Sequence, residues 1–373
     1  MPKSKGSFYE VKDEAFSFDT FFNPDNGQYL RTGILDANGN DTGVEPFMAS
    51  FPHLLDIGIM GHCNHGLSGL CTAAGNNCYQ NGASKWQANM TFADFRSIVD
   101  QSKGKVMQFA LGGRGDPDQH EAIESILAYS RENGIIPNMT TSGYELTAAK
   151  ADMMGKYCGA AAVSWYKTVY TEQAIDLLLA AGLKVNLHFV LSKSSLEEAI
   201  ELIEQQKLPA GINRIVFLLY KPVGQGSRDK VLSFDERSKY FFSLLDSEYG
   251  LQKMGFDSCC VPAVVNCTTI VDPNCYDACE AGRFSAYVTP DMQLLPCSFD
   301  QSLRWQIPLP GSTLQTAWRS PAMEVFRRRL RTACPNCHNR ALCMGGCGIE
   351  PSINLCDKPS RTRGVLHNDE IQN

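Results

Sequence analysis

The sequence lacks a long apolar run, a basic excess and internal repeats, and each absence excludes a class of protein. The best candidate for a membrane span, residues 174–191, is interrupted by Asp176, Lys184, Asn186 and His188, so we expect no membrane contact. The first ten residues, MPKSKGSFYE, form no apolar signal region, which predicts a cytoplasmic protein. With 40 acidic residues against 34 Lys and Arg, the net charge is −6, and we expect no nucleic-acid partner.

Cysteine is the residue type in excess, with 15 in 373 residues. Disulfides are rare in the cytoplasm, and an odd number does not suit a closed disulfide framework, so clustered thiols indicate metal ligands. For the adjacent Cys259 and Cys260, outside the clusters, plain buried thiols are favoured over a reactive role. Eleven of the fifteen fall into an early and a late cluster: Cys63, Cys71 and Cys78, then Cys275, Cys279, Cys297, Cys334, Cys337, Cys343, Cys347 and Cys356.

The middle of the chain alternates short apolar runs with amphipathic helical stretches. This alternation predicts right-handed crossovers and a parallel sheet, here an α/β fold with a partial (β/α)6 TIM-type barrel over residues 53–255. Ligand sites then belong at the carboxyl ends of the strands. Ser195 and Glu198 have the spacing of a capping box at the start of one helix. The six expected strands lie within 53–60, 105–111, 135–143, 160–166, 184–191 and 213–220.

The two flanking regions differ from the barrel in composition. Residues 1–52 predict a small β appendage, with Asn26-Gly27 as the turn of a hairpin. From about residue 256 to 373 the periodicity disappears and Cys, Pro and Gly dominate. Such a segment has little core of its own, so we expect a cysteine-rich extension that needs metal to fold.

The early cysteine cluster comes directly after the first expected strand. Three thiolates on one loop can hold three irons of a four-iron cluster, whose full ligation uses four cysteines, so one iron would stay open. An open coordination position is what separates a reactive metal centre from a structural one. Zinc remains an alternative, with His62 or His65 as the fourth ligand.

The segment DIGIMGHC…CYQNG around these cysteines resembles the cluster loop of the radical S-adenosylmethionine (radical SAM) enzymes, in which an aromatic residue, here Tyr79, typically follows the last cysteine. The family usually has three and then two residues between its cysteines, and here there are seven and then six. Lengthening a flexible loop costs only about 0.6 kcal/mol per doubling, so the same cluster is physically possible. The resemblance implies a [4Fe–4S] cluster on Cys63, Cys71 and Cys78.

Further segments match this family by position. GGRGDP (112–117) follows the second strand, where the family's glycine-rich segment approaches the methionine amino group of SAM. Polar residues at the ends of the middle strands bind the ribose and carboxylate in the family. The resemblance therefore implies a SAM site formed by Gly112, Gly113, Arg114, Thr141, Ser142 and Ser164.

The late cysteine cluster resembles the SPASM extension of radical SAM enzymes, which holds two auxiliary four-iron clusters. The resemblance assigns Cys275, Cys279, Cys297 and Cys347 to auxiliary cluster I. It assigns Cys334, Cys337, Cys343 and Cys356 to auxiliary cluster II, which gives three [4Fe–4S] clusters in all. Two zinc knuckles are the alternative. The basic run 326–331 just before Cys334 predicts a solvated helix face, with a role beside cluster charge or an acidic substrate as the second interpretation.

The resemblance implies a cytoplasmic maturase that cleaves SAM to a 5′-deoxyadenosyl radical and abstracts hydrogen from a ribosomally made peptide, to crosslink or otherwise modify a residue. The alternatives are a radical SAM dehydrogenase acting on a small molecule or on a protein such as a sulfatase, and a zinc-dependent binding protein. Sulfatase maturases carry an acidic residue directly after the equivalent of Cys297; here Ser298 stands there and Asp300 is the nearest acid, our candidate catalytic residue. The implied partners are a peptide substrate, a separate leader-recognition protein and an electron donor such as flavodoxin or ferredoxin.

Overall fold

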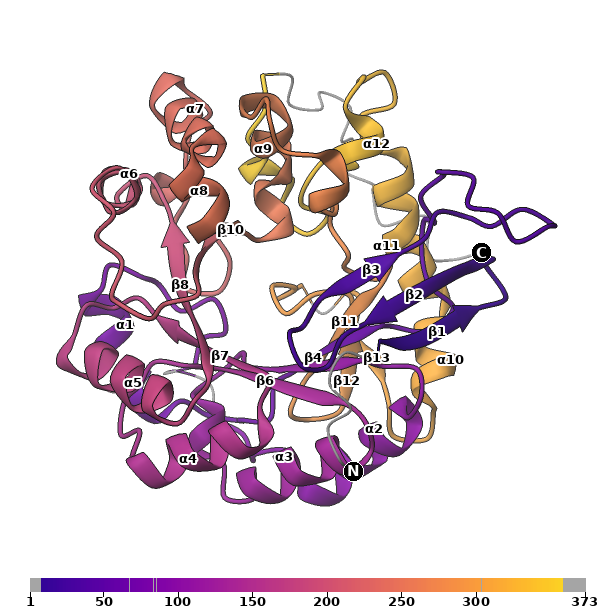
Figure 1. Cartoon of the computed structure of the whole chain (residues 1–373). Coiled ribbons are helices and arrows are strands. Elements are labelled where there is room, and N and C mark those ends of the chain that lie inside the picture. Colours follow the sequence, from indigo (N-terminus) through magenta and orange to yellow (C-terminus); the bar gives the residue numbers. More distant parts are fainter. Residues whose placement is uncertain (1–7, 67, 83, 85, 303, 358–373) are drawn as a thin grey trace.

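A computed structural model describes residues 8–66, 68–82, 84, 86–302 and 304–357, and its centre is one ten-stranded sheet (Figure 1). The strands run in the order β10-β9-β8-β7-β6-β5-β4-β11-β12-β13, and β4 to β9 are parallel neighbours in chain order. All six strands expected from the apolar runs are therefore present, and the predicted partial barrel is confirmed. They are β4 (Leu54–Ile57), β5 (Gln108–Leu111), β6 (Ile136–Thr141), β7 (Ala160–Ser164), β8 (Lys184–Leu191) and β9 (Arg214–Leu219).

Helices cover the outer face of these strands (Figure 1). Along β8 the alternate residues Val185, Leu187, Phe189 and Leu191 are buried, as a pleated strand against a helical layer requires. Each such side chain contributes about 1.5–3 kcal/mol of burial free energy, which explains why short apolar runs suffice to place the strands. The helices are α2 (Phe92–Ser102), α3 (Ile123–Glu132), α4 (Ala148–Tyr157), α5 (Val169–Ala180) and α6 (Leu196–Glu204).

The capping box predicted at the start of α6 is wrong. The Ser195 hydroxyl donates to the carbonyl of Val190 at 2.8 Å and makes no capping hydrogen bond. Glu198 instead accepts hydrogen bonds from the Trp165 indole and the Lys167 ammonium group. Hydrogen bonds with residues from other elements therefore replace the local capping hydrogen bonds that the sequence predicts.

The segment after residue 255 continues the barrel sheet rather than standing apart from it. β10 (Met254–Phe256) pairs with β9, β11 (Ser285–Val288) runs parallel to β4, and β12 (Gln293–Leu295) and β13 (Ile307–Pro308) follow antiparallel. Apolar side chains such as Trp318 and Met323 join the main core, so the segment shares the barrel's core; its need for metal stays a prediction. Its helices, with the two that precede β10, are α7 (Glu236–Ser243), α8 (Glu248–Lys253), α9 (Val261–Cys267), α10 (Leu314–Trp318), α11 (Pro321–Thr332) and α12 (Arg340–Cys343).

One residue of the basic run on α11 is not solvated as predicted. Arg327 is buried, with its Nε donating to the carbonyl of Gly282 at 2.6 Å and its guanidinium carbon 4.4 Å from the centre of the Trp318 ring. Arg328 and Arg331 are exposed, as a solvated face requires. Arg327 therefore joins α11 to the loop before β11.

The N-terminal residues form a separate three-stranded sheet of β1 (Tyr9–Asp13), β2 (Phe18–Phe22) and β3 (Tyr29–Arg31). Phe22 pairs with Tyr29 across a turn that contains Asn26 and Gly27, so the predicted hairpin is confirmed. Gly27 has a φ of 76°, which glycine adopts without strain. No helix in the described part of the chain is long and apolar enough to cross a membrane.

Candidate active site and cysteine centres

The early cysteines lie on the loop that follows β4, at the carboxyl ends of the barrel strands. His65 forms hydrogen bonds with both Cys63 and Cys71, and its Nδ1 lies 4.0 Å from the Cys71 sulfur. The backbone N–H of Gly82 donates to the Cys78 sulfur at 3.2 Å. A Cβ on Gly82 would lie 2.8 Å from the Cβ of Cys63, so only glycine allows this approach. The structure thus brings the three predicted thiols around one loop.

The two histidines of this loop have different surroundings. The His62 ring stacks on Trp86 with centroids 3.8 Å apart, and His65 forms an ion pair with Asp116 at 3.5 Å. Burial lowers the pKa of His65, but hydrogen bonds with Asp116, Cys63 and Cys71 raise it well above its ordinary value. Zinc with His62 or His65 as the fourth ligand stays a prediction.

The loop between Cys71 and Cys78 is held by the segment that follows β9. The N–H of Gln225 donates to the carbonyl of Cys78 at 3.0 Å, and the Asn77 side chain donates to the Gln225 carbonyl at 2.6 Å. Lys230 donates to the Gly75 carbonyl at 2.7 Å and to the Asn77 side chain at 2.8 Å. These contacts fix the long loop against the last parallel strand of the predicted barrel.

The glycine-rich segment after β5 packs directly against the cysteine loop. Gly113 has a φ of 94°, a left-handed conformation that favours glycine. The buried Arg114 donates from Nη1 to the carbonyl of Gly61 at 2.9 Å. The structure therefore places Arg114 against the cysteine loop, with Gly112 and Gly113 directly before it beside the end of β4, while their binding of SAM stays a prediction.

Asp116 in this segment and Asp118 directly after it accept hydrogen bonds from the hydroxyl groups at the end of β6. Asp116 accepts from the N–H and the hydroxyl of Ser142, at 2.9 and 2.5 Å. Asp118 accepts from the Thr141 hydroxyl at 2.9 Å. Burial and, after it, the charge of Asp116 raise the pKa of Asp118, Lys150 lowers it, and the net pKa is about 6. Thr141 and Ser142 thus lie at the predicted strand end, with partners of their own.

The remaining predicted SAM residue, Ser164, lies at the end of β7. It forms a hydrogen bond with Tyr166, whose hydroxyl lies 3.3 Å from the Cys71 sulfur. Burial, and then the neighbouring Cys71, raise the pKa of Tyr166 well above its ordinary value. Ser164 is thus linked through Tyr166 to Cys71, as Ser142 is linked through Asp116 to His65 on the same loop.

In the late cluster, the four cysteines predicted for auxiliary cluster II line one cavity of about 150 Å³. The other polar residues that line it are Asn266, His338, Asn339, Asn354 and Asp357, and the cavity lies between α9 and α12. Burial raises the pKa of Cys343, and the nearby thiols of this group contribute in the same direction. Four convergent thiols around one space fit a four-iron cluster. The cysteines are Cys334, Cys337, Cys343 and Cys356.

For auxiliary cluster I the structure brings three of the four predicted cysteines together. Cys279 and Cys347 both act on the thiol of Cys297, whose pKa burial raises strongly. Burial likewise raises the pKa of Cys279 to about 11. Cys275 is exposed to solvent. In the described part of the chain, no three His, Cys, Asp or Glu side chains have the spacing of ligands to a single ion.

The sequence did not single out the buried Lys221, which directly follows Tyr220 at the end of β9. Its ammonium group forms an ion pair with Asp257 at 2.9 Å and lies 4.1 Å from the centre of the Phe299 ring. Its charge acts on Cys347 and Cys259. The sequence feature that could have indicated it is a lysine just after a buried strand, because burying an unpaired charge costs free energy.

A second residue that the sequence did not single out is Asp56, on β4. Burial raises the pKa of its carboxyl group to about 7, and a hydrogen bond with Ser298 works in the opposite direction. The carbonyl of Ser298 accepts from Gln80 at 2.6 Å, and the Tyr79 ring stacks on Phe299 with centroids 4.3 Å apart. The residues after Cys78 therefore meet those after Cys297 beside this acid. The signal was a carboxylate within an apolar strand.

Asp300, the candidate catalytic residue, is buried beyond Phe299. Its Oδ1 accepts from the N–H and hydroxyl of Ser302, at 3.0 and 2.6 Å. Its Oδ2 is buried without a hydrogen-bond partner among the described residues. One carboxylate oxygen of Asp300 is thus hydrogen-bonded within the protein, and the catalytic role of Asp300 stays a prediction.

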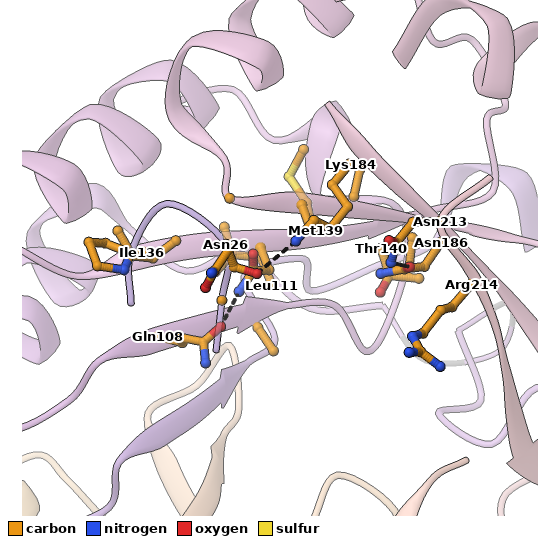
Figure 2. A pocket seen from close by; sticks show the side chains of 18 of the residues that line it. Asn26, Gln108, Leu111, Ile136, Met139, Thr140, Lys184, Asn186, Asn213 and Arg214 are labelled. Atoms are coloured by element: carbon orange, nitrogen blue, oxygen red, sulfur yellow. Dashed lines mark hydrogen bonds between the residues drawn. The ribbon is translucent and has the colours of Figure 1, made fainter. Parts of the chain in front are cut away.

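A cavity of about 510 Å³ is lined by residues of β5, β6, β7 and β8 (Figure 2). The hairpin turn borders it, and the Lys184 ammonium group donates to the carbonyl of Asn26 at 2.7 Å. Asn138 donates to Gln108 and Asn213 to Asn186, so the amide groups along its wall bond to one another. No predicted site residue lines this cavity.

Solved structures of similar shape extend over most of the chain. Streptococcus suis SuiB bound to S-adenosylmethionine aligns with a TM-score of 0.61 and 18% identity, over 84% of this chain and 78% of SuiB. SuiB bound to precursor peptide SuiA gives 0.60 and 19%, over 80% and 72%. Native anSMEcpe with bound AdoMet gives 0.58 and 16%, over 83% and 92%.

The chain has the same fold. The resemblance to radical SAM enzymes that the motifs indicate is confirmed at the level of the fold, which includes the large parallel sheet. No family model and no curated protein sequence matches the chain. The reaction and the residues that perform it therefore rest on the site itself.

Proposed function

We propose that this protein is a radical SAM maturase that reductively cleaves S-adenosylmethionine and abstracts hydrogen from a ribosomally made peptide, to crosslink or otherwise modify a residue. The observation that carries the proposal is the convergence of Cys63, Cys71 and Cys78 at the carboxyl ends of the strands, beside the glycine-rich loop. That edge of a parallel barrel is where ligands bind. The likeness to SuiB bound to a precursor peptide supports a peptide substrate.

The three thiols would hold a [4Fe–4S] cluster with one open iron, which supplies the electron for SAM cleavage when bound. The chain's own residues then bind and orient the nucleotide. Gly112 and Gly113 allow close approach of a ligand to the backbone. Asp116 fixes Ser142 and faces His65, so it sets the shape of the edge beside the cluster. Thr141 and Ser164 complete the proposed SAM site.

The auxiliary centres would carry an electron away from the substrate. Cys334, Cys337, Cys343 and Cys356 surround a common space with four thiols, a full ligand set that leaves no open iron. We infer electron transfer or structural support for this centre rather than substrate binding. An electron donor such as flavodoxin or ferredoxin and a separate leader-recognition protein complete the proposed set of partners.

Dehydrogenation of a small molecule or of a protein such as a sulfatase is the second candidate. One observation favours it: Asp56 forms a hydrogen bond with Ser298, the residue directly after Cys297. A carboxyl group whose pKa is raised to about 7 can accept a proton at physiological pH, which oxidation of an alcohol or thiol requires.

The test is anaerobic reconstitution of the full chain, followed by incubation with SAM, a reductant and candidate substrates. Formation of 5′-deoxyadenosine would establish SAM cleavage, and mass spectrometry would show whether a peptide, a sulfatase peptide or a small molecule loses hydrogen. Peptides encoded beside the gene are the first candidates. Stoichiometric zinc with negligible iron, or reconstituted enzyme that never cleaves SAM, would refute the proposal.

A further inference from the structure

We propose that Cys259, rather than Cys275, is the fourth cysteine ligand of auxiliary cluster I, together with Cys279, Cys297 and Cys347. The inference rests on the proposed function, because it assumes that the late cysteines hold iron–sulfur clusters. It concerns a thiol for which the sequence offered only burial as an explanation.

Cys259 lies on a short 3₁₀ helix, Ser258–Cys260, directly after β10. It is buried, and it shares a hydrogen bond with Cys347, which is also buried. Cys347 in turn acts on Cys279 and Cys297, so these four sulfurs form one group at the edge of the barrel. A cubane needs four convergent thiolates, and this group supplies them.

Cys275 has a different environment. It ends the 3₁₀ helix Pro273–Cys275, and it is exposed to solvent, as are Thr269 and Ile270 earlier in the same connection. To bind the cluster, Cys275 would have to move inward from the surface. Cys259 already contacts a member of the group.

The charge distribution also favours Cys259. The buried Lys221 acts electrostatically on both Cys259 and Cys347, and it is fixed by its ion pair with Asp257 at 2.9 Å. Thiolates and a cluster carry negative charge into a buried site, which a fixed neighbouring cation stabilises. The Lys221 ammonium group therefore lies close to the negative charge that a cluster bound by Cys259 and Cys347 would carry.

The adjacent thiol provides a matched control. Cys260 is also fully buried, but its sulfur lies 3.8 Å from the carbonyl of Phe217 on β9. Phe217 belongs to the main core. Cys259 and Cys260 thus share sequence position and burial, and they differ in which group they contact.

The proposal has a structural consequence. Cys259 follows the last parallel strand on one edge of the barrel, whereas Cys279 and Cys297 flank β11 and β12 beyond the first strand. A cluster bound to all of them would link the β10 edge of the sheet to β11 and β12 beyond β4, with Cys347 from the C-terminal segment. That cluster would then crosslink the two sides of the opening of the partial barrel.

The test compares four single variants of the full chain, reconstituted anaerobically: Cys259→Ala, Cys259→Ser, Cys275→Ala and Cys260→Ala. Iron, acid-labile sulfide and the electron paramagnetic resonance spectra of the oxidised and of the reduced protein are measured for each, because a three-iron cluster gives its usual signal only when oxidised. We expect Cys259→Ala to lose up to about four irons per chain or to show a three-iron signal. Cys259→Ser should retain iron with an altered spectrum, because a serine oxygen can replace the sulfur. Cys275→Ala and Cys260→Ala should match the unaltered protein.

Each outcome distinguishes this inference from the proposed function. Loss of iron in Cys275→Ala with normal iron in Cys259→Ala would overturn it, as would equal losses in both. Cys259→Ser with the unaltered spectrum and iron content, alongside normal iron in Cys259→Ala, would also overturn it. Absence of iron from the unaltered protein would instead refute the proposed function.

Discussion

Asp56 gives a pH dependence of stability that can be worked out from its surroundings. Burial raises the pKa of its carboxyl group from 3.8 to about 7 in the folded chain. The folded state therefore binds a proton that the unfolded state releases between these values, so stability is full below pH 3.8 and declines as the pH rises to about 7. Three pKa units correspond to at most about 4 kcal/mol over the whole range, and the part lost between pH 6 and pH 8 is about 1.4 kcal/mol.

The variant Asp56→Asn keeps the shape of the side chain and removes the titration. We expect the fall in the free energy of unfolding between pH 6 and pH 8 to be about 1.4 kcal/mol smaller in Asp56→Asn than in the unaltered protein, because Glu280, whose pKa burial raises to about 7, titrates in the same range in both. Denaturant unfolding of the reconstituted protein at both pH values measures the difference. Asp152→Asn, at an exposed position of α4, is the control and should behave like the unaltered protein. Equal pH dependence in Asp56→Asn and the unaltered protein would refute the reasoning.

The same variant tests the chemistry proposed for this acid. If Asp56 accepts a proton from the substrate, Asp56→Asn should lower product formation while 5′-deoxyadenosine is still formed, because the SAM cluster is held by other residues. Product yield of the unaltered enzyme should rise with pH through about 7, as the carboxyl group ionises. Equal product yield in the variant would assign Asp56 a structural role only.

Three further predictions concern the cysteine centres. Reconstituted protein should hold about 12 irons per chain, and replacing Cys63, Cys71 and Cys78 by Ala should abolish 5′-deoxyadenosine formation and leave about eight; zinc in place of iron, or SAM cleavage by the triple variant, would contradict this. Cys343→Ala should lose about one cluster's iron and become more sensitive to protease after residue 255, since metal sites contribute on the order of 10 kcal/mol to such segments; full iron and unaltered protease resistance would contradict it. Asn77→Ala should slow assembly of the first cluster under limiting iron, because it removes contacts to Gln225 and Lys230; Asn76→Ala is its control, and equal assembly rates would contradict it.

The barrel was predictable because its strands carry their own signal. Short apolar runs flanked by helical periodicity mark strands that are buried by helices, and β4 to β9 occur where such runs stand. The hairpin at Asn26-Gly27 was equally local, since two residues there determine the turn. In both cases the energy that decides the structure comes from residues close in the sequence.

The contacts that complete the site are long-range, and the sequence does not show them. β11 joins the sheet beside β4 although about 230 residues separate them, because its neighbour presents an unpaired strand edge. Arg327 leaves the solvated face of its helix because the carbonyl of Gly282 and the Trp318 ring are in reach. Lys221 and Cys259 both interact with Cys347, which lies far away in the sequence, so neither residue could be recognised from its own neighbours in the chain.

The long spacing of the early cysteines shows how long-range contacts can compensate for a longer loop between metal ligands. Gaps of seven and six residues in place of three and two raise the loop-closure cost by about 1.7 kcal/mol in total. The segment after β9 forms hydrogen bonds with Gly75, Asn77 and Cys78, and each bond contributes about 0.5–1.5 kcal/mol to stability. Together they match or exceed the added cost, so the longer loop is held as firmly as a short one. The strength of the motif therefore depends less on its spacing than on a distant segment that the spacing cannot reveal.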